Sequence, residues 1–267
     1  MADISLYTIR HRVGRLMGAM HTATPNGGFS TTATNTKELA VYVDDYFNDW
    51  HGHFFAGSNR DTDFEVTDSA KANGKLTVSP AASDTIDAQD LLELHQDFAP
   101  IEINDFINLA ISMVEEEALL DSVDETIQAK AATFEYTIPD MYSIDRVYLE
   151  QGTGDRYSQS GNLIDRRHYR ILHSNPPKLW FNDSYVTLTA GRTIRLVGTK
   201  VQAQLVKDDD MCSISQVFVV YQAKALLHES RIRGEDFEGH TIQMRLAQAR
   251  ANEEREGMLV PMRGIKV

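Results

Sequence analysis

Apolar residues recur at spacings of three and four in several parts of the chain and predict amphipathic helices there. The clearest pattern follows Pro100, a residue that suits a first helical turn. Its apolar stripe has six members: Ile103, Phe106, Ile107, Ala110, Ile111 and Val114. Residues 215–231 are apolar on nearly all sides, so we expect this helix to be packed on several sides. A last helix follows Gly234, and its expected inward residues are Ile242, Leu246 and Ala249.

Two more helices are predicted before residue 51. The apolar face of the first consists of Ile9, Val13, Leu16, Met17 and Met20. We expect its three basic residues to lie off that face: Arg10, Arg12 and Arg15. The second helix, after Thr36, has an aromatic stripe that consists of Leu39, Val43, Tyr46, Phe47 and Trp50. Such a stripe is more typical of a core than of a cofactor site.

Short strands separated by turn residues are the pattern of residues 133–206. The expected strands are 133–139, 144–150, 168–173, 178–182, 185–189, 193–198 and 201–206. Their regular spacing favours an antiparallel sandwich or a small barrel, and the pattern leaves both open. Within residues 51–96, the segments 64–68 and 75–79 flank the turn-forming Asn73-Gly74 and predict a small hairpin-like insertion. Residues 87–98 fit a short helix or a strand.

Together these elements predict an α+β fold. It is a helical bundle with an inserted antiparallel β-sandwich or small barrel and an extended C-terminal tail. The helical body covers residues 1–132 and 207–256, with the small strand insertion at about 51–96. The β module covers residues 133–206, and the tail covers residues 257–267.

Charge is distributed unevenly. The net charge is −13, and residues 37–130 alone hold 21 acidic and five basic side chains. This acidity fits a solvated surface, a surface that repels polyanions, or one that meets a basic partner. No basic stripe with interleaved aromatic residues is present, so we do not expect sequence-specific nucleic-acid binding.

Composition also bears on the compartment. The single cysteine, Cys212, excludes a disulfide framework. No apolar run approaches the roughly 18–20 residues that cross a bilayer. The first residues lack the apolar core of a secretory signal. We therefore expect no association with membranes.

Candidate chemistry is weak throughout the sequence. His51 and His53, with acidic Asp44 and Asp45 nearby, could supply metal ligands, but two histidines around a glycine are a weak zinc signal. Asp208–Asp210 could bind a hard cation but lacks the spacing of a calcium loop. A hydrolase that uses His51, His53 and an acidic partner therefore stays a minor possibility.

The motifs of common enzymes are missing as well. Gly152-Thr-Gly154 lacks the third glycine or the lysine that a phosphate-binding loop needs. The sequence contains no Gly-x-Ser-x-Gly nucleophile elbow. We expect no catalytic residues, no metal and no cofactor, and hence no enzymatic activity.

The C-terminal segment GMLVPMRGIKV is the best candidate for a functional segment. Its proposed partner-binding residues are Met258, Leu259, Val260, Pro261, Met262, Arg263, Ile265 and Val267. Proline and two glycines prevent a long helix, and an apolar tail is avoided unless it packs on something. It could pack on its own subunit, it could insert into a neighbour by strand addition or groove binding, or it could be disordered.

Four segments between residues 99 and 256 carry a likeness to a known family. They are APIEINDFINLAISMVEEEA, TFEYTIPDMYSIDRVYLE, TLTAGRTIRLVG and VFVVYQAKALLHES. Their layout resembles the head-to-tail connector proteins of tailed bacteriophages, also called adaptor or head-completion proteins. The resemblance implies a helical bundle with inserted strands, no catalytic site, and assembly into a ring under the portal.

The resemblance also implies partners and a location. The protein would be a structural component of the virion neck that is present in the host cytoplasm during assembly. It would form a ring with its own copies, a dodecamer in similar proteins. It would bind the portal protein and other neck or tail-completion proteins, with Met258–Val267 as the docking tail, and DNA would pass through without sequence-specific binding. The position in the neck stays open between adaptor, stopper and terminator.

Three acidic residues fit that expectation. Glu115, Glu116 and Glu117 follow the helix after Pro100, where carboxylates oppose the helix dipole and so serve a surface or a partner. An acidic lumen repels phosphate and lets DNA slide, so we expect these residues to face the DNA.

A ligand-binding β module is the alternative function. It would be carried on a virion or surface protein, would bind a ligand such as a carbohydrate, and would use Trp180, Tyr169 and Tyr185 as a platform.

Overall fold

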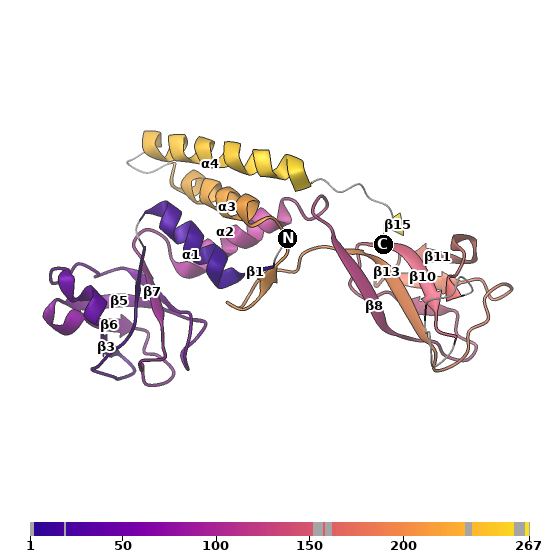
Figure 1. Cartoon of the computed structure of the whole chain (residues 1–267), viewed down its shortest axis with the longest axis horizontal. Coiled ribbons are helices and arrows are strands. Elements are labelled where there is room, and N and C mark those ends of the chain that lie inside the picture. Colours follow the sequence, from indigo (N-terminus) through magenta and orange to yellow (C-terminus); the bar gives the residue numbers. More distant parts are fainter. Residues whose placement is uncertain are drawn as a thin grey trace. The chain divides into compact units, whose positions relative to one another are not determined.

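The computed structural model describes residues 3–18, 20–151, 157, 162–232, 237–258 and 265–266. The chain divides into two compact units (Figure 1). The first unit combines residues 1–114 with residues 204–258, and the second combines residues 115–203 with residues 259–267. The fold is mixed α and β, and its sheets are curled and antiparallel, as expected at this coarse level.

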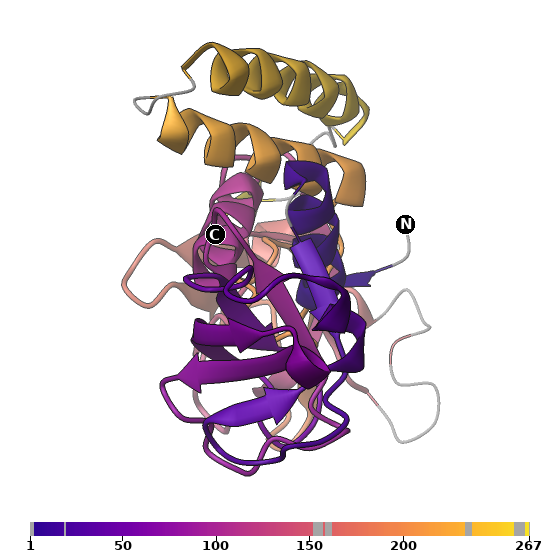
Figure 2. The ribbon, with the colours of Figure 1, turned by 90° about the vertical axis from the view of Figure 1, so that its left-hand side faces the viewer.

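Four helices in the first unit pack on one another. They are α1 (Leu6–Met17), α2 (Pro100–Ser112), α3 (Gln216–Arg231) and α4 (Phe237–Met258). Helices α1 and α2 lie side by side against α3, and α4 lies along the other side of α3 (Figure 2). Because α3 contacts all three other helices, the expected packing on several sides is confirmed. None of the helices within the described residues is both long and apolar enough to cross a membrane.

Helices α1 and α4 differ from expectation in the side that they bury. Helix α1 ends at Met17, and the expected face member Met20 lies in a strand. Arg10, expected off the apolar face, is completely buried. Helix α4 faces the core with Ala247 and Ala251, whereas Ile242 and Leu246 are 58% and 62% exposed. The expectation for Ile242, Leu246 and Ala249 was therefore wrong, because two helices that pack closely place small side chains between their backbones.

A six-stranded sheet fills the rest of the first unit. Its strands are β2 (Met20–Ala23), β3 (Ala33–Asn35), β4 (His51–Phe54), β5 (Thr62–Ala70), β6 (Lys75–Ser79) and β7 (Leu92–His95). The order is β2-β7-β4-β5-β6-β3. The expected hairpin is β5–β6, joined by the 3-10 turn η2 (Ala72–Gly74). Residues 92–95, which periodicity left undecided, form β7. A short antiparallel pair joins β1 (Ile4–Ser5), which precedes α1, to β14 (Met211–Cys212), which precedes α3.

The predicted aromatic helix does not form. Residues 37–41 make a 3-10 turn, η1 (Lys37–Val41), and irregular turns follow it. Asp45 and Asp49 have φ angles of 64° and 65°, a left-handed conformation that aspartate tolerates and that interrupts a helix. Their backbone N–H groups donate to carbonyls of β5 at 2.7 and 2.8 Å. The expected core role is confirmed for Leu39, Phe47 and Trp50, which are buried. It was wrong for Val43 and Tyr46, which are 66% and 43% exposed.

Two antiparallel sheets make up the second unit. One has the order β15-β10-β13-β8 and the other has the order β11-β12-β9. Their bounds are β8 (Leu120–Gln128), β9 (Glu135–Thr137), β10 (Ser143–Leu149), β11 (Tyr169–Leu172), β12 (Lys178–Phe181), β13 (Thr193–Lys200) and β15 (Ile265–Lys266), with a 3-10 turn η4 (Arg166–His168) before β11. Both sheets contribute to one apolar core that includes Ile144, Leu179 and Ile194.

Strand assignments in this unit were partly wrong. Strand β8 was missed because its sequence, LDSVDETIQ, is rich in residues that strands disfavour. It forms because it pairs with β13 over most of its length. Residues 185–189 and 201–206, expected as strands, are irregular. In the latter, Leu205 N–H donates to the Asn108 side chain of α2 and not to a sheet partner.

Candidate functional site

A buried charge cluster lies where α1 meets β7 and the segment before α3. At its centre is Arg10, whose side chain is fully buried. Its Nη1 and Nη2 donate to the two carboxylate oxygens of Asp208 at 2.6 and 3.0 Å. Its Nε donates to Glu93 of β7, and Nη1 also reaches Asn104 Oδ1 of α2 at 3.3 Å. The guanidinium therefore joins four segments that are distant in the sequence.

Mutual pairing keeps the members of this cluster charged. Burial opposes the charge of Arg10, but the carboxylates of Glu93 and Asp208 outweigh it and raise its pKa. Burial also favours the neutral acid of Glu93, yet hydrogen bonding to His95 and the charge of Arg10 lower the pKa of Glu93. For Asp208, burial is outweighed by hydrogen bonds from His53 and Arg10, which lower its pKa to about 2.

His53 of β4 extends the cluster. Its Nδ1 lies 2.6 Å from Asp63 Oδ1 and its Nε2 lies 3.0 Å from Asp208 Oδ2. Burial lowers the pKa of the imidazole, but hydrogen bonds to Asp208 and Asp63 raise it by more than burial lowers it. The pKa of His53 is therefore raised above its ordinary value. Both ring nitrogens can then donate to a carboxylate, as an imidazolium does.

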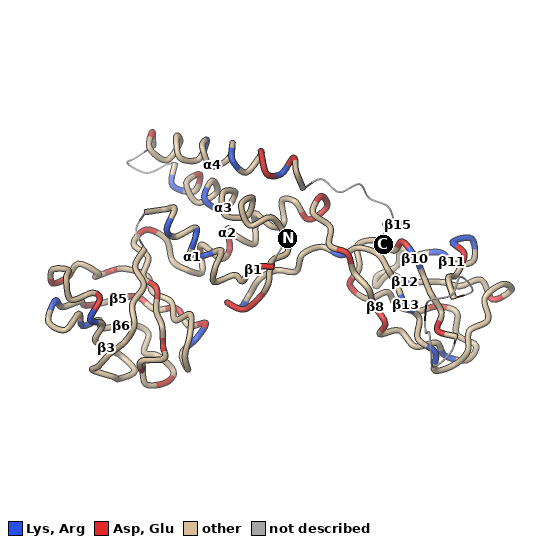
Figure 3. Tube along the Cα trace, viewed as in Figure 1, with Lys and Arg blue, Asp and Glu red and all other residues tan. Residues whose placement is uncertain are grey.

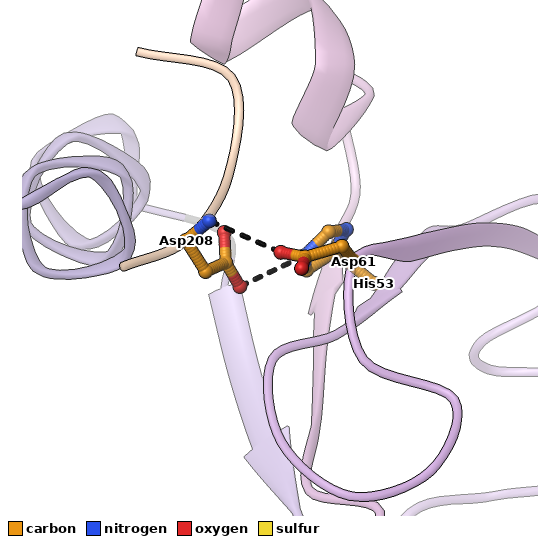
Figure 4. A group of neighbouring side chains, drawn as sticks. All are labelled: His53, Asp61 and Asp208. Carbon is orange, nitrogen blue, oxygen red and sulfur yellow. Dashed lines mark hydrogen bonds and ion pairs between the residues drawn. The ribbon is translucent and has the colours of Figure 1, made fainter. Parts of the chain in front are cut away.

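Two members of the cluster, His53 and Asp208, together with the nearby Asp61, also meet the distance requirement for a metal site. Ligand atoms of His53, Asp61 and Asp208 lie within 4.8 Å of one another (Figure 4). However, both oxygens of Asp208 already accept from Arg10, and Asp61 Oδ1 accepts from the Asp208 backbone N–H at 3.0 Å. A cation placed here would meet the Arg10 guanidinium, so the geometry favours a charge-paired structural cluster.

Only part of this cluster was predicted from the sequence. His53 and Asp208 were candidates for separate sites, and the structure brings them together. His51, Asp44 and Asp45 are not part of the cluster. Arg10 and Glu93 were missed. One signal for Arg10 was available: it lies four residues after Leu6 and three before Val13, both of which are buried, and so falls on the buried arc.

The proposed tail residues are placed only in part. Met258 is the last residue of α4, and Ile265–Lys266 form β15, which pairs with Ser143 and Ile144 at the edge of β10. Residues 259–264 and Val267 lie outside the described residues.

The three proposed lumen residues follow α2 in a turn. Glu115 and Glu116 are exposed, and Glu117 is half-buried. Acidic residues continue along β8, which carries Asp121, Asp124 and Glu125 (Figure 3).

The proposed aromatic platform is not assembled. Tyr169 is buried at 5% exposure. The Arg170 guanidinium lies 4.5 Å from the ring centroid of Trp180. Tyr185 is 70% exposed but stacks on His168, with centroids 4.8 Å apart. These three aromatics therefore do not form one exposed, coplanar surface.

A buried cluster whose charges are paired with one another holds segments together, which defines a structural role for this site. Comparison with known families agrees. The model of the SU10 adaptor protein family matches residues 81–259, more than half of the chain, and the chain belongs to this family. The resemblance to phage head-to-tail adaptors is thereby confirmed. A search of curated proteins found no match.

Family membership has direct consequences. It supports a structural, adaptor role in a bacteriophage, as a virion component that associates with other head or tail proteins. It also suggests a function without catalysis. The match begins at residue 81, so α1 and strands β2–β6 precede it.

Replacing Arg10 with methionine tests the structural role of the cluster. We expect Arg10→Met to lower the free energy of unfolding by about 3–5 kcal/mol, because it leaves two buried carboxylates without their cation. The measurement is denaturant unfolding followed by circular dichroism. Arg12→Met, on the exposed side of the same helix, is the matched control and should change stability by less than about 0.5 kcal/mol. Equal stability of the two variants would contradict the role.

Protonation of His53 should make stability depend on pH. The pKa of His53 in the folded state is raised above the ordinary value of about 6.5. The contribution of protonated His53 to the free energy of unfolding is therefore fully present below about pH 6.5. It is lost as pH rises through the folded pKa. Each unit by which the pKa is raised corresponds to about 1.4 kcal/mol of additional stability from the protonated side chain. The difference in unfolding free energy between wild type and His53→Gln should therefore shrink between acidic and alkaline pH. His51→Gln, on the same strand, is the control, and a difference for His53→Gln that does not change with pH would contradict the assignment.

Proposed function

We propose that this protein forms a ring in the neck of a tailed phage, joining the portal at the head to the tail and letting DNA pass. The observation that carries the proposal is its membership of the adaptor family. The proposed partners are further copies of the chain, in a dodecamer as the resemblance implies, together with the portal protein and other neck or tail-completion proteins. Assembly takes place in the host cytoplasm.

We assign partner docking to the tail, Met258–Val267. Its composition supports this role, because apolar side chains alternate with breakers that prevent a helix. The pairing of Ile265–Lys266 with β10 supports it further, since a segment that can extend one sheet edge can extend another by the same backbone hydrogen bonds. Met262 and Val260 would then supply side-chain specificity in the docked state.

Deletion of residues 258–267 tests this assignment. We expect the truncated protein to keep its fold, because β15 contributes only two residues to its sheet, and to lose binding to the portal protein of the same phage. Circular dichroism reports the fold, and co-sedimentation with purified portal reports binding. A full-length variant with serine at Leu259, Val260 and Met262 keeps the tail backbone but removes its apolar side chains. Weaker co-sedimentation of this variant with portal would assign the binding to side-chain recognition and not to backbone pairing alone. Unchanged portal binding by the truncated protein would refute the docking role.

We also assign Glu115, Glu116 and Glu117 to the DNA-facing surface. Carboxylates in that position repel phosphate and keep the duplex from adhering to the ring wall. The exposure of Glu115 and Glu116 supports an assignment to a surface.

Changing these three glutamates to glutamine should raise the affinity of the assembled ring for duplex DNA severalfold at low salt. The increase should fade at high salt because screening removes the repulsion. The measurement is fluorescence anisotropy with a labelled duplex. A variant with glutamine at Glu253, Glu254 and Glu256 of α4 changes the charge equally and is the control. A ring structure with Glu115–Glu117 on its outer wall would overturn the assignment.

A further inference from the structure

The outer face of α2 is apolar without being covered. Ile101, Leu109 and Met113 are 59%, 45% and 44% exposed, and they recur at multiples of four residues. Asp105 lies in the same row and is also exposed. The opposite side of α2 is buried against α1 and α3 through residues such as Ile103 and Ile107. Single exposed apolar residues are common, but a row on one helix face is typical of a docking surface.

A groove between α1 and α3 complements that row. It has a volume of about 290 Å³, and its apolar lining includes Leu16, Val217 and Tyr221. Arg12 and Arg15 of α1 border it. The basic groove margin and the acidic residue in the α2 row have opposite charges, and Figure 3 shows basic positions on α1 and acidic ones on α2.

These two surfaces face away from each other within one subunit. Within α2, Ile101, Asp105 and Leu109 lie opposite the side that packs on α1 and α3. Met113, the residue after α2, is at the edge of the row, and its sulfur accepts from Gln222 Nε2 of α3 at 3.6 Å. On α1, Arg10 reaches toward Asn104 of α2, whereas Arg12 and Leu16 lie on the flank that borders α3. Figure 2 shows α1 and α2 side by side beneath α3. Two different, complementary surfaces on opposite sides make a head-to-tail contact, which is the contact type that generates rings.

We propose that the row Ile101–Asp105–Leu109–Met113 of one subunit docks into the α1/α3 groove of the next copy of this chain. This inference rests on the proposed ring and names the surfaces that build it. Leu109 enters the apolar groove, and Asp105 pairs with Arg12 and Arg15 at its margin. The chain's own tail fits the groove less well, since Arg263 and Lys266 have the same charge as the groove margin.

Self-association of the full chain tests the docking. Sedimentation velocity over a concentration series, up to about millimolar, measures it for wild type and variants. Leu109→Asp should weaken association about tenfold or more, because it places a charge against an apolar lining. Ile242→Asp, at an exposed apolar position on α4, is the matched control and should associate as wild type does. Circular dichroism confirms that both variants fold.

Charge reversal distinguishes a lost contact from a destabilised fold, because combining reversals on both sides restores the contact but would not restore the fold. Asp105→Arg alone, or Arg12→Glu with Arg15→Glu, should weaken association, and the combination of all three changes should restore most of it. A wild type that stays monomeric, a Leu109→Asp variant that associates normally, or an Ile242→Asp variant that alone fails would each overturn the docking. Any of these leaves the neck function itself to be decided separately by portal binding.

Discussion

The buried guanidinium of Arg10 is the constraint on which the first unit depends. A charge removed from water is tolerated only where other groups compensate it completely. Here the compensation comes from Asp208, Glu93 and Asn104. Since these residues belong to the segment before α3, to β7 and to α2, one side chain of α1 fixes how three other segments lie. Asp208 also accepts from the backbone N–H of Tyr7 at 3.2 Å, so the start of α1 is held to the same segment.

The cluster also joins the family-matched part of the chain to what precedes it. The side chains of Arg10 and His53 come before residue 81, and the carboxylates of Glu93 and Asp208 come after it. Without the N-terminal part, two buried carboxylates would be left unpaired. The sheet that carries His53 is therefore not a detachable addition, and the first unit folds around charges contributed by both parts.

Interior pairing and outward assembly are separate tasks in this protein. The buried charges are paired with one another, and the uncovered apolar residues of α2, Ile101 and Leu109, lie on its exposed face. That division suits a structural adaptor, which associates with other head or tail proteins of the phage. The short strand β15, in contrast, pairs through its backbone with the edge of β10.

Local pattern in the sequence determined much of the secondary structure and the adaptor family. Helix α2 with its buried stripe, the hairpin β5–β6, and an α3 packed on several sides all follow from periodicity and turn residues. Tertiary contacts decided the rest. Residues 37–50 form turns instead of a helix because their backbone N–H groups bond to β5. The acidic segment β8 is a strand because β13 pairs with it. Arg10 enters the core because Glu93 and Asp208, 83 and 198 residues away, neutralise it. Local spacing places Arg10 on the buried arc of α1, but it does not identify the distant carboxylates that compensate the charge, and only the folded chain brings these groups together.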